Sequence, residues 1–141
     1  MAYVQRFQDL IVYQKARILW REIFEITKAF PRNESFSLTD QIRRSSRSVG
    51  AQIAEAWGKR RYQKHFLSKL TDADNEALET QHWIEVAKDS GYISEEKAQE
   101  LLLQAEEVGR LLGGMMNKSA MFCNPSKISE TQAEYFVNSR E

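Results

Sequence analysis

The chain has 141 residues, and its 20 basic and 20 acidic side chains leave no net charge at neutral pH. One cysteine excludes an internal disulfide, and the short apolar runs exclude a membrane-spanning segment. Only two prolines and six glycines interrupt the chain, so its composition favours long helices within one domain. No basic segment followed by an apolar core opens the sequence, and we expect a cytoplasmic protein.

Two amphipathic helices are predicted in the first half of the chain. The first spans residues 7–29, where apolar residues recur at steps of three and four, and Pro31 follows its end. The second spans residues 37–58. Ser37 and Asp40 have the spacing of a capping box at its start.

Two further helices are predicted in the second half. The third begins within residues 61–64 and ends near Asp89, where Gly91 is placed to close it in a left-handed conformation. The fourth follows Ser94, a serine cap before two acids, and ends near Asn117.

Short loops between these helices predict an all-α fold, an antiparallel up-down-up-down four-helix bundle. We expect this bundle domain to occupy residues 1–117. Residues 118–141 contain a proline and many polar side chains, and they are interpreted as a C-terminal tail. The tail is expected to be mostly disordered or to form a short extra helix around residues 130–137.

The charges divide into two blocks along the chain. Residues 43–69 carry many basic side chains and a single acid, Glu55. Residues 72–107 are rich in acids, which only Lys88 and Lys97 oppose. Such blocks predict a dipolar surface that pairs with itself or with a charged partner, and solvated helix faces are the alternative.

The second helix carries a cluster of arginines opposite its apolar stripe. Arg43, Arg44 and Arg47 lie three and four residues apart, where like charges destabilise an isolated helix by about 0.2–0.5 kcal/mol each. We therefore expect anionic partners, either carboxylates of the third or fourth helix, in the same or a neighbouring subunit, or phosphates. Ala51 and Ala54 lie among the arginines and allow another backbone to come close. They favour subunit packing over phosphate binding and over a solvated face.

A basic loop joins the second and third helices. Interleaved cations and an aromatic can bind a nucleic-acid backbone and stack a base, and a solvated turn is the alternative. The residues concerned are Lys59, Arg60, Arg61, Tyr62, Lys64 and His65.

Aromatic residues widen the apolar arc of the first helix beyond what one bundle core requires. Trp20 and Phe24 lie beside its core stripe, and aromatics so placed are typical of an interface. We therefore predict that they anchor contacts between copies of the chain.

No pattern in the sequence indicates catalysis or metal binding. Glu79 and His82 match one Glu-x-x-His pair of di-metal bundles, but a second pair is missing. Cys123 lies in the predicted tail, and neither a zinc spacing nor a glycine-rich loop occurs. We expect a non-enzymatic protein without cofactor or metal.

Three segments of the chain resemble one protein family. They read FQDLIVYQKA (7–16), FPRNESFSLTDQIRRSSRSVGAQIAEAW (30–57) and ALETQHWIEVAKDSGYIS (77–94). Together they resemble the proteins encoded by intervening sequences of bacterial 23S rRNA genes and their relatives, over about residues 7–116. The resemblance implies a left-handed up-and-down bundle, assembly into ring-like homopentamers and no established enzymatic activity.

These observations together predict a homo-oligomeric scaffold or accessory module, expected to be a pentamer. RNA or DNA is the expected further partner, bound through the arginine cluster and the basic loop. The alternative is an adaptor that binds another protein and has no role with nucleic acid.

Overall fold

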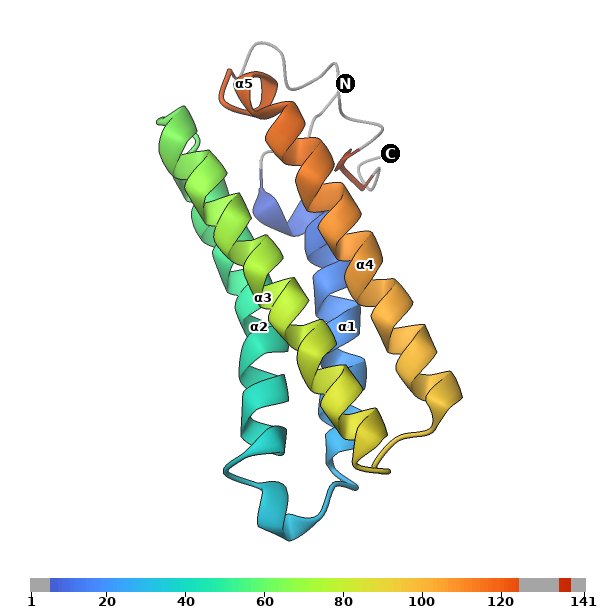
Figure 1. Cartoon of the computed structure of the whole chain (residues 1–141). Helices are drawn as coiled ribbons and strands as arrows, with labels where there is room; N and C mark the ends of the chain where they lie inside the picture. The colour runs from blue at the N-terminus through green and yellow to red at the C-terminus, as the bar shows by residue number, and fades with distance from the viewer. Residues whose placement is uncertain (1–5, 125–134, 138–141) are drawn as a thin grey trace.

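Four long helices lie side by side in an elongated molecule (Figure 1). The computed structural model describes residues 6–124 and 135–137. In Figure 1 the α1–α2 and α3–α4 connections lie at the lower end and the α2–α3 connection at the upper end. Within the described residues no strand occurs, and the predicted all-α fold with four long helices is confirmed. The helices are α1 Ile11–Thr27, α2 Leu38–Gly58, α3 Gln63–Asp89, α4 Glu95–Asn117 and the short α5 Ser119–Phe122, with 3-10 turns at Phe7–Asp9 and Arg32–Glu34.

The first helix begins later than the sequence predicts. Leu10 has an extended backbone, with φ −69° and ψ 133°, and it separates a 3-10 turn from α1. Its side chain is buried, and it forms an isolated bridge with Phe136. The Val137 N–H also donates to the Asp9 carbonyl at 2.7 Å. The contact with the C-terminal segment is therefore made at the point where the helix is interrupted.

The predicted capping box at the start of α2 is wrong. The Ser37 side chain makes no capping bond to α2, and its hydroxyl donates to a Glu34 carboxylate oxygen at 2.5 Å. The same oxygen accepts the Leu38 N–H at 3.2 Å and so takes the place of the cap. Asp40 instead accepts a hydrogen bond from Arg44 at 2.9 Å. The 3-10 turn before α2 brings a longer carboxylate to the helix end, and that carboxylate outcompetes the predicted pair.

The predicted chemistry of the α3–α4 connection is confirmed. Gly91 has φ +79°, the left-handed conformation that residues with a Cβ rarely adopt. The Tyr92 N–H donates to the Ala87 carbonyl at 3.0 Å, which closes α3. At the start of α4, the Ser94 hydroxyl oxygen accepts the Lys97 N–H at 3.0 Å. Both helix ends follow from residues that act within one or two turns of themselves.

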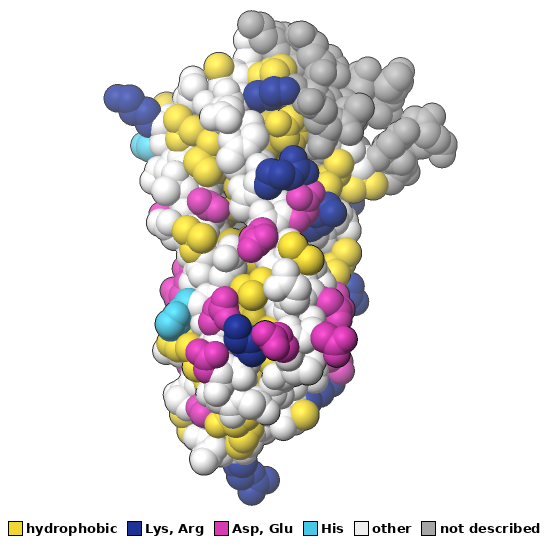
Figure 2. Space-filling view, turned by 45° about the vertical axis from the view of Figure 1, so that its right-hand side comes forward, with side chains coloured by type: hydrophobic (Ala, Val, Ile, Leu, Met, Phe, Trp, Pro, Cys, Tyr) yellow, Lys and Arg dark blue, Asp and Glu magenta, His cyan; other side chains and the backbone are white. Residues whose placement is uncertain are grey.

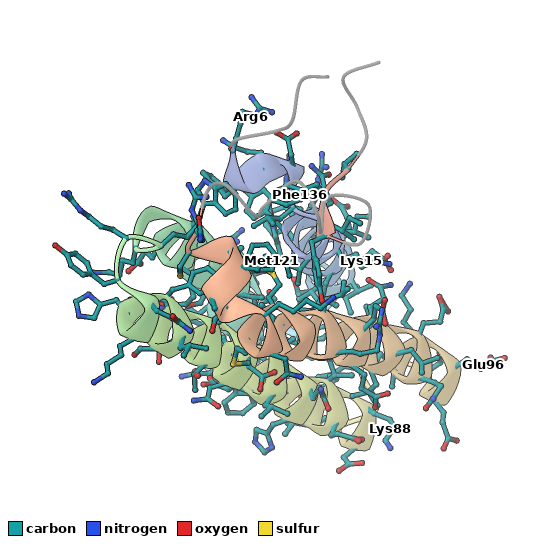
Figure 3. The ribbon with its side chains drawn as sticks, turned by 90° about the horizontal axis from the view of Figure 1, so that it is seen from above. Arg6, Lys15, Lys88, Glu96, Met121 and Phe136 are labelled. Carbon is teal, nitrogen blue, oxygen red and sulfur yellow. The ribbon has the colours of Figure 1, made fainter. Side chains whose placement is uncertain are left out.

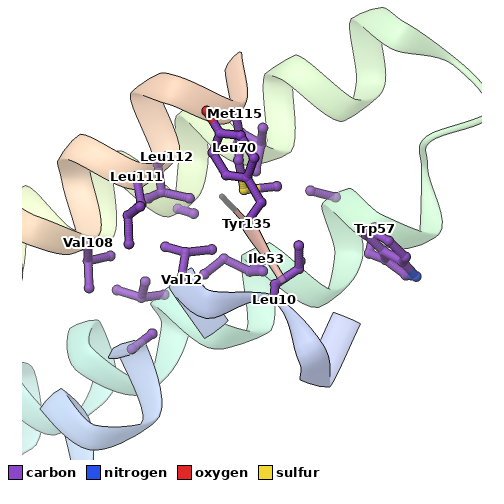
Figure 4. Packing of buried hydrophobic residues seen from close by; sticks show 14 of the residues in the cluster. Leu10, Val12, Ile53, Trp57, Leu70, Val108, Leu111, Leu112, Met115 and Tyr135 are labelled. Carbon is purple, nitrogen blue, oxygen red and sulfur yellow. The ribbon is translucent and has the colours of Figure 1, made fainter. Parts of the chain in front are cut away.

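Buried side chains fill the two halves of the bundle as two large clusters. One of them occupies the end near α5, where Trp57 and Tyr135 are among its members (Figure 4). The other lies between the opposite halves of the four helices and includes Leu19, Ile42 and Leu101. Each of these three residues lies three or four positions from another buried apolar residue of its helix, as the helical periodicity of the sequence predicts.

The core extends into the region predicted as a tail. Phe122 is fully buried, and its ring centroid lies 5.2 Å from that of Tyr135 and 6.2 Å from that of Phe136. Phe136 also meets Trp57 edge to face at 5.8 Å. Seen from above, Met121 and Phe136 lie over this end of the bundle (Figure 3). Most of the predicted tail and of its short helix, residues 125–134 and 138–141, lies outside the described residues.

Candidate assembly and nucleic-acid surfaces

Two arginines of α2 lie on two aromatic rings of α1. The Arg43 guanidinium is 4.7 Å from the Phe24 ring centroid, and that of Arg47 is 5.2 Å from both Trp20 and Phe24. The two rings meet edge to face at 6.2 Å. The sequence predicts the arginines and the aromatics as separate features, and the packing of α1 on α2 joins them. We call these four residues the arginine–aromatic surface.

The two arginines of this surface are held differently. Arg43 is half-buried, and its Nε donates to the Thr27 hydroxyl at 2.8 Å. The Thr27 hydroxyl in turn donates to the Phe24 carbonyl at 2.9 Å, which ties Arg43 to α1. Arg47 is exposed, and it makes no ion pair within the described part of the chain. Its charge therefore lies over the rings without a carboxylate partner.

The outer face of α2 carries the remaining residues predicted for this region. Arg44 pairs with Asp40 of its own helix at 2.9 Å, and both side chains are exposed enough for water to screen the pair. Ala51 is exposed and Ala54 is half-buried. The small side chains of both alanines leave room for another backbone to approach at these two positions.

An open hollow of about 670 Å³ lies along α2 and the adjacent flank of α3. Its α2 side includes Arg43 and Arg47, and its α3 side includes Glu76 and Glu79. Burial raises the pKa of Glu76, and repulsion from Glu79 adds to this rise, while a hydrogen bond from Ser48 opposes it. Within residues 6–124 and 135–137, neither glutamate forms an ion pair with a basic side chain. Cations and acids thus line one hollow without pairing across it.

The basic turn, residues 59–65, contains one arginine that differs from its neighbours. The Arg60 guanidinium lies 3.5 Å from the Trp57 ring centroid, and its Nε donates to the Trp57 carbonyl at 2.9 Å. Burial lowers the pKa of Arg60. Lys59, Arg61 and Lys64 are exposed, and none of them has an ion pair among the described residues. These three side chains, and not Arg60, are therefore the cations of the turn that are most accessible to an external anion.

Charge is distributed unevenly over the molecule. On the face in Figure 2, acidic side chains gather over the middle and lower part. Within the acidic block, Glu107 accepts from Arg110 at 2.6 Å, and Glu85 pairs with Lys88 at 3.0 Å. The acidic block is thus partly neutralised within the chain, in contrast to the basic turn.

The groups considered for catalysis or metal binding have other roles in the structure. Glu79 accepts a hydrogen bond from the Trp83 indole at 3.0 Å, and the His82 ring lies 4.6 Å from the Trp83 ring. No set of three or more metal-ligating side chains gathers within residues 6–124 and 135–137. Burial raises the pKa of the half-buried Cys123 thiol, which disfavours the reactive thiolate.

Two exposed apolar residues belong to no site that the sequence predicts. Ile18 of α1 is 52% exposed and Leu103 of α4 is 54% exposed, and both line a groove of about 270 Å³. Both fall outside the inward stripes of their helices, so a search for apolar residues on the predicted outer faces would find them. No helix in the described ranges combines the length and the apolar character needed to cross a membrane.

Four long helices, with an arginine–aromatic surface and a basic turn, define a helical-bundle protein. The family model of the 23S rRNA-intervening sequence proteins matches residues 8–114, and the chain belongs to this family, as its sequence predicts. The matched region ends before α5 and before the packed residues 135–137.

A solved structure resembles the bundle over most of its length. It is the crystal structure of a protein of unknown function from the S23 ribosomal protein family of Bacteroides thetaiotaomicron. The two chains are 28% identical with a TM-score of 0.67, and the match covers 75% of this chain and 98% of that one. A comparison with the curated proteins finds no match.

Proposed function

We propose that this chain is a non-enzymatic, cytoplasmic scaffold that assembles as a homopentamer and presents its basic turns to RNA. Each copy would be a left-handed up-down-up-down bundle. The observation that carries the proposal is the hollow along α2, where Arg47 has no carboxylate partner and Glu76 and Glu79 have no cation among the described residues.

Contact between copies would pair these charges. The arginine–aromatic surface over α1 and α2 of one copy can meet the acidic flank of α3 of the next, and such head-to-tail contacts close into a ring when the rotation allows it. Guanidinium groups held over the rings of Trp20 and Phe24 form a broad surface that loses little conformational entropy on docking. A cation beside Glu76 would also relieve the cost of burying its charge. Ala51 and Ala54, on the outer face of α2, would let the backbone of the neighbouring copy approach closely.

The mass of the protein in solution tests this assembly. We expect five times the 16.4 kDa chain mass in sedimentation or light scattering at micromolar concentration. Arg47→Glu should weaken association by more than about tenfold, because it places like charges across the contact. Arg47→Glu combined with Glu76→Arg should restore it, and Arg32→Glu, in the turn before α2, serves as a control. A monomeric wild-type chain would refute the assembly, and unchanged association of Arg47→Glu would remove this surface from it.

The basic turn supports the association with RNA. Lys59, Arg61 and Lys64 hold no ion pair within the described chain, so binding to phosphates would not first break a salt bridge. A ring would repeat the turn in every copy and convert weak local attraction into multivalent binding. Replacing Lys59 and Arg61 with alanine should lower RNA affinity and reduce the salt slope by about one for each phosphate that the variant no longer binds. RNA affinity that is unchanged in this variant would contradict the role of the turn.

A protein-binding adaptor is the second candidate, and the groove between α1 and α4 favours it. Ile18 and Leu103 are exposed there. Gln104 also lines this groove, and its buried Oε1 has no hydrogen-bond partner among the described residues. We expect Ile18→Glu to abolish binding of such a partner, and that binding to be insensitive to salt. If Ile18→Glu changes the mass of the oligomer instead, the groove belongs to self-assembly.

A further inference from the structure

We propose that the start of α3 binds single-stranded nucleic acid, with one base stacked on the Tyr62 ring. This inference rests on the proposed association with RNA and specifies the form of RNA that the basic turn takes. The sequence alone suggests only one aromatic among the cations, which is too little for a stacking surface.

The structure adds a second ring beside Tyr62. His65 lies one helical turn further along, and the two ring centroids are 5.4 Å apart with an angle of 53° between the planes. Tyr62 is 58% exposed, and His65 is also exposed. Rings that pack on one another instead of on the core leave aromatic surface open to water. A base that stacks on them would cover this surface.

Cations flank the two rings. Arg61, Tyr62, Lys64 and His65 line an open hollow of about 630 Å³. Arg61 and Lys64 have no ion pair within the described residues, so each is free to bind a phosphate on either side of a stacked base. The side chains of the α2–α3 connection project away from the bundle, where an extended strand can reach them (Figure 3).

The start of α3 offers a further phosphate contact. Tyr62 is the N-cap residue of α3, and no side chain caps this helix end. The first backbone N–H groups of the long helix therefore have no side-chain cap, and they favour an anionic oxygen. Stacking surface, free cations and open amides thus meet within a few consecutive residues of chain.

The rings indicate a single strand in preference to a duplex. Bases within a duplex are already stacked and present only their edges, whereas a single strand can turn a base onto an aromatic ring. Phosphate contacts alone do not discriminate between the two forms. The stacking contribution should therefore appear only with a single strand.

Fluorescence anisotropy of the full-length protein with labelled oligouridine, and with a duplex RNA of the same length, tests the proposal. We expect Tyr62→Ala to weaken single-strand binding by about five- to a hundred-fold and to leave duplex binding unchanged. Tyr62→Phe should keep the affinity, because it keeps the ring. Phe36→Ala is the matched control, since Phe36 is 96% exposed but lies before α2, away from the basic turn. Thermal melts should be alike for all variants.

The possible results separate this inference from the proposed function. If Tyr62→Ala binds the single strand as tightly as wild type while the Lys59 and Arg61 variant binds it weakly, stacking is refuted and RNA association stands. Equal loss for single strand and duplex in Tyr62→Ala would also refute stacking. If the wild-type protein binds neither RNA, both proposals are wrong.

Discussion

Two adjacent glycines of α4 differ in what a methyl group would meet. A Cβ at Gly113 would have nothing within 4 Å, whereas a Cβ at Gly114 would lie 2.8 Å from the Tyr135 hydroxyl oxygen. Alanine stabilises a helix interior over glycine by about 0.5–1 kcal/mol. We therefore predict that Gly113→Ala raises the free energy of unfolding by about this amount, which is roughly 2–4 °C in Tm for a chain of this size.

Gly114→Ala has the same favourable effect on helix stability, but its added methyl group must displace Tyr135. That side chain is 9% exposed and packs edge to face on Phe122. Its full displacement would lose roughly the 1.5–3 kcal/mol of a buried aromatic or large aliphatic side chain. The net effect of Gly114→Ala should therefore be a destabilisation of about 1–2 kcal/mol, opposite in sign to Gly113→Ala.

Thermal and urea melts followed by circular dichroism check this contrast. In a Tyr135→Ala background the obstacle is gone, and Gly114→Ala should become stabilising by about 0.5–1 kcal/mol. This reversal of sign separates the steric clash from any general intolerance of α4. Equal stabilisation by both alanines in the wild-type chain would refute the reasoning, because Tyr135 would then not lie against Gly114.

Two further predictions concern α2 and α3. Burial and the nearby Glu79 raise the pKa of Glu76 in the folded state. The free energy of unfolding therefore falls as pH rises from the pKa of this group in the unfolded chain through its pKa in the folded chain. In the dissociated Arg47→Glu variant, Glu76→Gln should therefore raise Tm at pH 7 and lose this advantage near pH 4. The buried hydroxyls of Ser45 and Thr80 lie 2.9 Å apart, and Thr80→Val should cost about 1–3 kcal/mol. In the Thr80→Val background, Ser45→Ala should lower the free energy of unfolding by less than it does in the wild-type chain. Strictly additive losses of unfolding free energy in urea melts would contradict the hydrogen bond.

The helix ends show where local chemistry is sufficient for prediction. Gly91 and Ser94 act within one or two turns of themselves, so their roles can be predicted from the sequence. Ser37 has a suitable partner by spacing, but Glu34 reaches the helix end first through a turn that no spacing rule anticipates. Leu10 fits the pattern of a helix, yet its contact with a segment more than a hundred residues away accompanies an extended backbone.

The candidate surfaces divide in the same way. The basic turn is predicted because its residues are consecutive, although only the structure shows that Arg60 turns back onto Trp57. The cation–π contact of Arg47 with Trp20 requires two helices at a specific rotation about their axes. Neither helix encodes that rotation by itself, so the sequence predicts the two residues only as separate features.

The sequence by itself determined four amphipathic helices, the family to which they belong and the positions of the charge blocks. Periodicity, capping residues and contiguous motifs act over a few residues. They can therefore be recognised without knowing which helix packs against them. Only the tertiary structure decided which faces meet, and it placed Phe122, Tyr135 and Phe136 over the end of the core. The physical reason is that side-chain packing between distant segments depends on how those segments are rotated and how closely they approach one another. No pattern within a few residues of sequence determines this arrangement.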